Sequence, residues 1–291
     1  MLYLLLISII FASLNSVVLH KADLSNGNTV YKFNMLVSAV WCVVLFAVNG
    51  FKISISSPAL IWGIVYGVTQ TLFILFKTLA MNSGPVSVTT LIGNMSLVVS
   101  IFFCFFVWQE AITASDIIGL VVLLIGIVLT TYKKDGEKIS RKWIIYSVFF
   151  LLFSASVGIS VKAFGKTGHT EVVGDMMIIA SFVMIFLYFI ICLLTGARKS
   201  GDSSKTREEN KFNKALILYS LLSGALSCGY QRLNIYLASA MNAVVFFPSF
   251  NGGVILLSTV LGIIILREKI TLKSFIGIMF GIAGICIIGI L

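Results

Sequence analysis

Charged residues are scarce in this sequence of 291 residues. Asp, Glu, Lys and Arg together make up 11% of it, against about 25% in a typical soluble domain. Hydrophobic residues make up 59%, and the mean hydropathy is +1.06. A soluble protein of this length could not bury so much apolar surface. We therefore expect a polytopic membrane protein without a sizeable soluble domain.

Residues that support catalysis or metal binding are also few. The two histidines lie at the edges of predicted loops, and the five cysteines fall in apolar segments without a CxxC spacing. Acidic residues and histidines do not cluster, and no GxxxxGK[ST] motif is present. We expect no metal site, no cofactor, no enzymatic activity and no direct use of ATP.

The net charge of +10 is concentrated in loops. Two polar segments, 133–142 and 198–214, contain 11 of the 21 Lys and Arg residues. Basic loops beside membrane spans are typical of the cytoplasmic side, so no nucleic-acid partner is expected. The same rule places both termini outside the cell.

Apolar runs of about 20 residues predict membrane spans. The first run lacks a basic segment before it and a cleavage site after it, so we expect it to be a retained span. Ten spans are predicted, at 1–19, 32–49, 58–80, 84–108, 113–132, 143–164, 173–196, 214–238, 241–266 and 271–291.

One stretch of the sequence occurs twice. The segment FFVWQEAITASDIIGLVVLLIGIVL at 105–129 aligns without a gap with IIILREKITLKSFIGIMFGIAGICI at 263–287. Glu110 falls on Glu268 in this alignment. Spans 4 and 5 therefore correspond to spans 9 and 10.

The starts of the two halves also correspond, because SLNSVVLHKA at 13–22 lies over SASVGISVKA at 154–163. Each half then has five spans, and an odd number inverts the second half relative to the first. We predict an all-α polytopic membrane protein with ten transmembrane helices in two inverted five-helix repeats, residues 1–136 and 137–291. Inverted repeats are a common plan among transporters.

The sequence resembles the EamA-domain family of the drug/metabolite transporter superfamily. The resemblance rests on the two five-span halves and on the acidic residue that closes the fourth span of each half, in VWQEAIT and LREKIT. It implies export or exchange of small metabolites. It also implies termini in the cytoplasm, which is opposite to the orientation that the charges favour. Small multidrug exporters of the superfamily have a glutamate in their first span where this chain has Asn15, which argues against proton-coupled export of lipophilic cations.

Polar side chains inside spans are costly in hydrocarbon unless they face protein or water. Several recur at helical spacing, and two interpretations are open: they form hydrogen bonds between helices, or they line a shared polar cavity. Pro248, together with the glycines that follow it, is expected to break its helix and free carbonyls. The predicted substrate-binding set is Arg232, Gln231, Ser227, Gln70, Asn94, Asn15 and Asn251.

Two cations within spans receive different interpretations. Arg232 lies about 9 Å from the nearest end of its span at 1.5 Å per residue. We expect it to face the cavity and bind a carboxylate or phosphate of the substrate. Lys77 lies about 4.5 Å from its helix end, so we expect it to extend to water.

The repeated glutamates and glycines are conserved between the halves of this one chain. Glu110 and Glu268 are interpreted either as a gate or proton site, or as N-terminal caps of the spans that follow them. The glycines predict close helix packing, either within the chain or in a homodimer.

These observations favour a secondary transporter of small metabolites in a bacterial inner (plasma) membrane, in contact with membrane lipids. The leading expectation is export or exchange of amino-acid-like or other anionic or zwitterionic solutes by alternating access. Uptake of a sugar or nucleotide-type solute, a multidrug exporter and a membrane scaffold are the alternatives.

Overall fold

The computed structural model describes residues 1–22, 24, 27–131, 140–199, 214–265 and 271–290. These residues form ten long helices and one short 3-10 helix. The helices are α1 (Leu2–Lys21), α2 (Gly27–Val48), α3 (Ser57–Met81), α4 (Val86–Trp108), α5 (Ala114–Thr131), α6 (Arg141–Lys166), η1 (Thr170–Val172), α7 (Val173–Lys199), α9 (Lys214–Ala240), α10 (Ala243–Ile265) and α11 (Leu272–Ile290).

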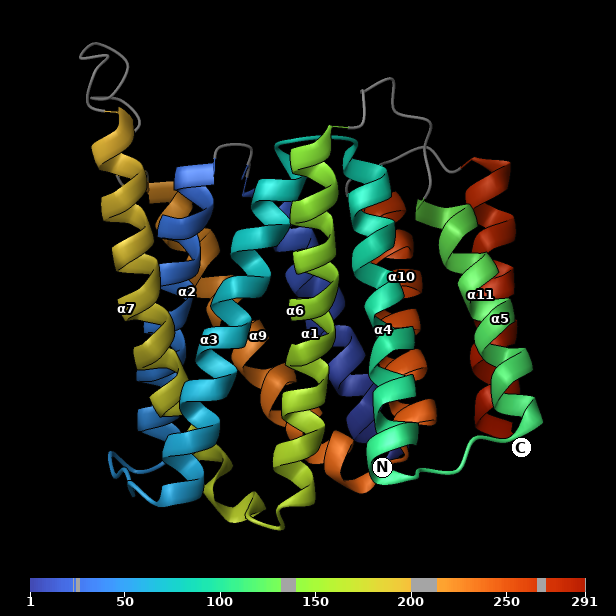
Figure 1. Ribbon diagram of the computed structural model, residues 1–291, viewed down its shortest axis with the longest axis horizontal. Helices are drawn as coiled ribbons and strands as arrows, with labels where there is room; N and C mark the ends of the chain where they lie inside the picture. The colour runs from blue at the N-terminus through green and yellow to red at the C-terminus, as the bar shows by residue number, and fades with distance from the viewer. Residues whose placement is uncertain (23, 25–26, 132–139, 200–213, 266–270, 291) are drawn as a thin grey trace.

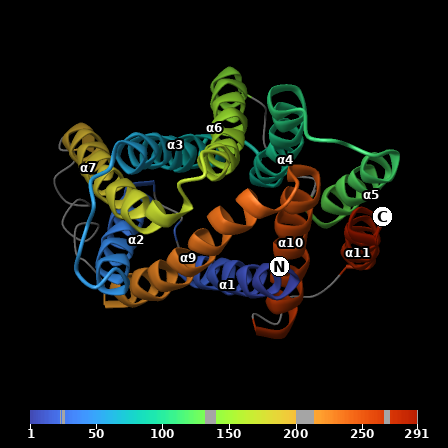
Figure 2. The ribbon, with the colours of Figure 1, turned by 90° about the horizontal axis from the view of Figure 1, so that it is seen from below.

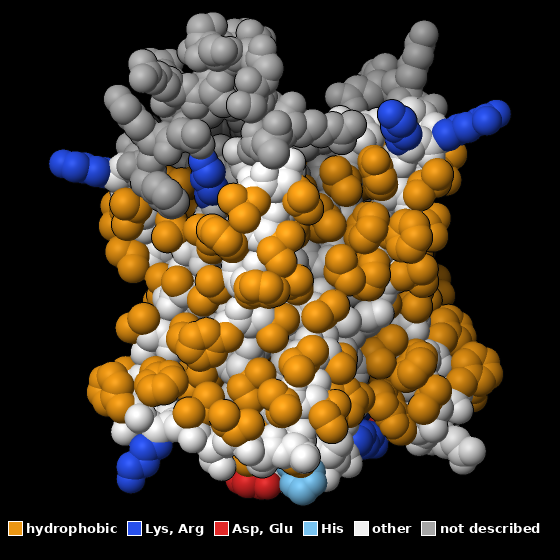
Figure 3. All heavy atoms as spheres, turned by 60° about the vertical axis from the view of Figure 1, so that its left-hand side comes forward, with side chains coloured by type: hydrophobic (Ala, Val, Ile, Leu, Met, Phe, Trp, Pro, Cys, Tyr) orange, Lys and Arg blue, Asp and Glu red, His pale blue; other side chains and the backbone are white. Residues whose placement is uncertain are grey.

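The ten predicted spans are thus confirmed as helices. Eight helical segments are long and apolar enough to cross a membrane by their own composition. The helix α9 is not among them, because its inward face is rich in serine and amide side chains. Large hydrophobic side chains cover the outside of the bundle, and charged side chains lie toward its two ends (Figure 3).

The two chain ends lie at the same end of the bundle, as an even number of spans requires (Figure 1). We call this end the terminal face. It also contains the connections α2–α3, α4–α5, α6–α7 and α9–α10. We call the opposite end the loop face.

The most extensive contacts between helices occur in matching pairs: when each helix is replaced by its equivalent in the other half, the contact is still present. We call α1–α5 the first repeat and α6–α11 the second repeat; the predicted boundary at 136/137 lies outside the described residues. The contact of α3 with α6 corresponds to that of α9 with α1, and the contact of α4 with α6 to that of α10 with α1. The pairs α2–α7 and α5–α11 each join equivalent helices (Figure 2). The inverted repeat is therefore present in the packing as well as in the sequence.

Glycines bring α5 and α11 to backbone distance. A Cβ atom added at Gly126 would lie 2.6 Å from the backbone nitrogen of Gly281, and one at Gly284 would lie 2.6 Å from that of Leu123. Small residues permit such approach where lipid gives no hydrophobic drive for association. On α3, Gly63 and Gly67 pack against α7 in the same way. The described glycine contacts are thus made within the chain.

The repeated threonines Thr113 and Thr271 cap the fifth helix of each repeat. The Thr113 backbone N–H donates to Asp116 Oδ2 (2.9 Å), and the Asp116 N–H donates to Thr113 Oγ1 (3.2 Å). Before α11, the Ser274 N–H donates to Thr271 Oγ1 (3.2 Å). These bonds satisfy free N–H groups of the first helical turn. The expectation that Glu110 caps α5 is therefore wrong.

The helix α10 continues through Pro248. It runs without a break from Ala243 to Ile265, although proline has no N–H to donate to the carbonyl four residues earlier. The side chain of Asn251 donates to the Phe247 carbonyl (2.9 Å) one turn away. The predicted break at this proline is wrong.

Candidate functional site

Two adjoining cavities lie between the repeats. The larger has a volume of about 290 Å³ and is lined by α1, α2, α3 and α4 of the first repeat and by α9 and α10 of the second. The smaller, of about 210 Å³, is lined by α3, α4, α6, α9 and α10. Five residues line both and form a shared layer between them: Gln70, Phe73, Tyr230, Phe250 and Asn251. We call the two together the central cavity.

The larger cavity extends toward the loop face. Its lining includes Leu19 near the end of α1, Asn34 in the first turns of α2 and Lys77 four residues before the end of α3. The smaller cavity extends toward the terminal face and is lined there by Phe246 and Val161, near the ends of α10 and α6.

Six of the seven predicted substrate residues line the central cavity. Asn15, Asn94 and Ser227 line its larger part, and Gln231 lines its smaller part. Gln70 and Asn251 belong to the shared layer. The polar residues of the two repeats therefore meet at one place, as their helical spacing predicted.

Hydrogen bonds between helices hold one wall of this cavity. Ser223 Oγ donates to Asn15 Oδ1 (2.7 Å), and Ser8 Oγ donates to Asn234 Oδ1 (2.7 Å), which join α9 to α1. Trp41 Nε1 donates to Ser227 Oγ (2.8 Å), which joins α2 to α9. Both interpretations of the polar residues thus apply. Some bond helix to helix, and in doing so they present their remaining polar atoms to the cavity.

Aromatic rings form part of the same lining. The rings of Phe246 and Phe250 stack with centroids 6.0 Å apart, and Tyr230 lies 6.2 Å from Phe250. Tyr66 does not line the central cavity; its side chain is buried, with 1% of its surface exposed. Tyr230, Phe246 and Phe250 therefore face the central cavity.

Arg232 does not lie in the central cavity. It is exposed and lines a separate groove of about 620 Å³ between α1, α2, α7 and α9, together with Phe11, Val48 and Glu171. Adjacent residues of a helix point about 100° apart. Arg232 therefore points away from the face that contains Gln231. The expected place of Arg232 is corrected.

Lys77 occupies the place expected for Arg232. Its side chain lines the larger cavity, and Nζ lies 6.0 Å from the centroid of the Phe73 ring, one turn earlier in α3. Side chains of a helix lean toward its N-terminus. Near the C-terminal end of α3, that direction leads into the membrane and not out to water. Lys77 therefore faces the larger cavity, which itself extends toward the loop face.

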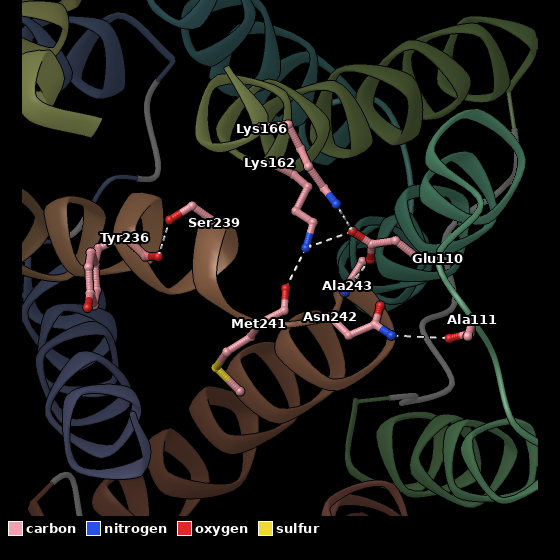
Figure 4. Close-up of polar contacts among 9 residues, drawn as sticks. All are labelled: Glu110, Ala111, Lys162, Lys166, Tyr236, Ser239, Met241, Asn242 and Ala243. Atoms are coloured by element: carbon pink, nitrogen blue, oxygen red, sulfur yellow. Dashed lines mark hydrogen bonds and ion pairs between the residues drawn. The ribbon is translucent and has the colours of Figure 1, made fainter. Parts of the chain in front are cut away.

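Below the smaller cavity, a charged cluster joins the repeats at the terminal face (Figure 4). Glu110, which follows α4, lies 3.0 Å from Lys162 Nζ and 3.1 Å from Lys166 Nζ. Its other oxygen accepts a hydrogen bond from the backbone N–H of Ala243 (2.7 Å), the first residue of α10. Lys162 also donates to the Met241 carbonyl. We call these residues the closing cluster.

The closing cluster explains the local structure around Glu110. Gln109 ends α4 in the left-handed region (φ 51°), an uncommon conformation for a residue other than glycine. The turn brings Glu110 beneath α10, where a carboxylate is stabilised by the helix N-terminus. Glu110 thus caps a helix of the opposite repeat. Its sequence counterpart Glu268 lies outside the described residues.

Two opposing effects set the pKa of Glu110. Partial burial raises it, but the hydrogen bond from Ala243 and the interactions with Lys162 and Lys166 outweigh burial and hold the pKa below its ordinary value. The carboxyl group is therefore ionised near neutral pH. Lys162 is almost fully buried, with 1% of its side chain exposed, and both of its described partners belong to other elements.

The sequence comparisons agree with this architecture. Residues 1–132 match the model of the EamA-like transporter family. A protein of Lactobacillus johnsonii described as "Putative sugar uptake protein" is 29% identical over 172 residues, which make up 59% of this chain and 54% of the relative. The chain thus matches about half the length of that relative.

A solved crystal structure shares the fold. It superposes with a TM-score of 0.72 over 98% of this chain and 94% of its own, at 11% sequence identity. The all-helical inverted-repeat fold is therefore shown by both packing and similarity. Together with the family match of residues 1–132, it shows that the chain is an integral membrane protein whose first repeat is similar to the EamA-like transporter family.

Proposed function

We propose that the chain is a secondary transporter that moves small polar metabolites through the central cavity by alternating access. The observation that supports this most directly is the closing cluster. Groups of both repeats block the terminal face immediately below a polar cavity that extends toward the loop face. Inverted halves of similar structure can exchange conformations, which would open that cavity to the other side.

The proposed solutes are amino-acid-like or other anionic or zwitterionic metabolites, moved by export or exchange across a bacterial inner (plasma) membrane. Lys77 supports an anionic group in the solute, and the amides of the lining support further polar groups. A cavity lined by aromatic rings and a few placed polar groups is typical of small-molecule sites.

Sugar uptake is the second candidate. It is favoured by the description of the Lactobacillus johnsonii relative and by the amides and aromatic rings of the shared layer. Such side chains bind neutral hydroxyl groups without requiring a charge on the solute.

Counterflow in proteoliposomes tests the proposal. Vesicles with purified protein are loaded with a mixed pool of metabolites, and exchange is measured by mass spectrometry beside protein-free vesicles. Selective exchange of charged metabolites is expected. Exchange of neutral sugars alone would favour the second candidate, and no exchange by protein shown to be folded would contradict transport.

A further inference from the structure

The polar groups of the central cavity are not all used by the fold. Most of the serine and asparagine side chains there bond to neighbouring helices, and that of Asn251 bonds within its own helix. Two groups of α3 differ. Gln70 Oε1 is buried and has no hydrogen-bond partner. Among the described residues none forms an ion pair or hydrogen bond with Lys77, whose nearest charge-stabilising neighbour is the Phe73 ring.

These two groups lie on one face of α3. They are seven residues apart, which is two helical turns, and Phe73 lies between them. Lys77 Nζ extends back toward Phe73, and Gln70, Phe73 and Lys77 all line the larger cavity. An anion acceptor for Lys77 and a hydrogen-bond donor for Gln70 would satisfy both.

The charge of the lining limits what that donor can be. Lys77 is the charged residue among those that line the central cavity, and no aspartate or glutamate is among the described lining residues. A solute ammonium group would be desolvated there without a carboxylate partner, which is costly. A hydroxyl group donates to the amide oxygen without that cost.

We infer that the central cavity selects small hydroxylated anions, solutes that combine a carboxylate or phosphate bound by Lys77 with a hydroxyl group bound by Gln70 Oε1. The inference rests on the proposed function and narrows it, because it excludes both neutral sugars and zwitterionic amino acids as preferred solutes. It also explains why amide and aromatic side chains, which can bind hydroxyl groups, line the same cavity as the cation Lys77.

Matched solutes test the charge requirement. Gluconate differs from glucose by a carboxylate, and glycerate differs from serine by a hydroxyl in place of an ammonium group. Binding to the purified full-length protein is measured by calorimetry, and exchange by counterflow. Gluconate is expected to bind at least about 10-fold more tightly than glucose, since a hydrogen bond to a charged group contributes about 1.5–3 kcal/mol. Glycerate is expected to bind more tightly than serine, because the ammonium group of serine would be desolvated without a carboxylate partner. Glucose 6-phosphate distinguishes phosphate from carboxylate as the anionic group.

Variants assign the effect to Lys77. Lys77→Met is expected to weaken gluconate about 10-fold or more and to leave glucose unchanged, and Lys77→Arg to restore gluconate binding in part. Gln70→Leu is expected to weaken gluconate and glycerate alike. Arg232→Gln, which removes a cation outside the central cavity, is the matched control and is expected to change none of these affinities.

Equal binding of gluconate and glucose, or of glycerate and serine, would overturn the inference, as would an unchanged gluconate affinity in folded Lys77→Met. Exchange of glucose or serine without gluconate or glycerate would leave the proposed transport intact and remove only this inference. Failure of the folded protein to exchange any metabolite would remove both.

Discussion

The closing cluster and the central cavity are both polar, but they differ in how their groups are satisfied. In the closing cluster, Glu110 and Lys162 each have at least two partners, and these partners come from both repeats. In the central cavity, Lys77 and Gln70 Oε1 have none among the described residues. The groups that stabilise this conformation are paired within the protein, whereas the groups that we propose to bind a solute have no partner among the described residues.

The largest expected effect comes from making the same substitution in the two regions. Lys162→Met is expected to lower the free energy of unfolding by about 3–5 kcal/mol, because it leaves Glu110 without its buried cation. Lys77→Met removes an unpaired cation and is expected to cause no loss of stability. Denaturant unfolding in detergent measures both. Equal losses in the two variants would contradict the comparison.

The next largest expected effect is that of low pH, which should weaken the closing cluster through Glu110. Because the pKa of Glu110 is lowered in the closed protein, its stabilising contribution is fully present above the ordinary value of 4.5 and is lost as the pH falls through the lowered pKa. Spin labels at the exposed residues Ala114 and Ala240 of the terminal face are expected to move apart only in that acidic range.

Glu110→Gln is the control for the acidic opening. Glutamine has no charge to lose, so the distance between the labels in this variant should not depend on pH between about 3 and 7, a range that includes the ordinary carboxyl pKa of 4.5. A wild-type distance that is also constant over this range would show that Glu110 does not hold the terminal face closed.

A smaller effect is expected at the threonine three residues after Glu110. Thr113→Ala removes the cap of α5 and should cost about 1 kcal/mol of stability. It should not change the distance between the labels of the terminal face, because its partner Asp116 lies in the same repeat. Thr271→Ala in the second repeat is the matched variant. A widened label distance in Thr113→Ala would mean that the cap and the closing cluster act as one unit.

The smallest effect is expected at Arg232. It lines a groove outside the central cavity, so Arg232→Gln should exchange metabolites within about twofold of the wild type, as for surface substitutions worth about 0.5 kcal/mol or less. Counterflow rates measured beside Lys77→Met give the test. A loss of exchange in Arg232→Gln equal to that in Lys77→Met would extend the solute path into the groove.

Much of the fold could be predicted because each membrane helix can be recognised from its own stretch of sequence. Each span is a long apolar run, and the repeat is a fixed offset in one chain, so neither requires knowledge of contacts. The amide residues of the site were also predictable, because a polar stripe in a span must face protein or water. Helical spacing alone placed Gln70 and Ser227 on inward faces.

The positions of Arg232 and Lys77 were predicted wrongly because we considered how far each residue lies from the end of its helix and not which face of the helix it occupies. Arg232 follows Gln231 by one residue, and this rotation of about 100° already removes it from the polar stripe. Lys77 follows Gln70 by seven residues and therefore shares its face. The role of Glu110 could not be found in this way. Its partners Lys162 and Ala243 lie 52 and 133 residues away in the sequence, and only the fold brings them together.

The α5–α11 pair, joined at backbone distance through Gly126 and Gly281, contributes no residue to the lining of the central cavity. The residues that line the proposed solute site and the residues that join α5 to α11 therefore lie on different helices. Substitutions in α3, α4, α9 or α10 alter the lining of the central cavity and require no change in α5 or α11. Laboratory evolution of new specificities can leave α5 and α11 untouched for the same reason.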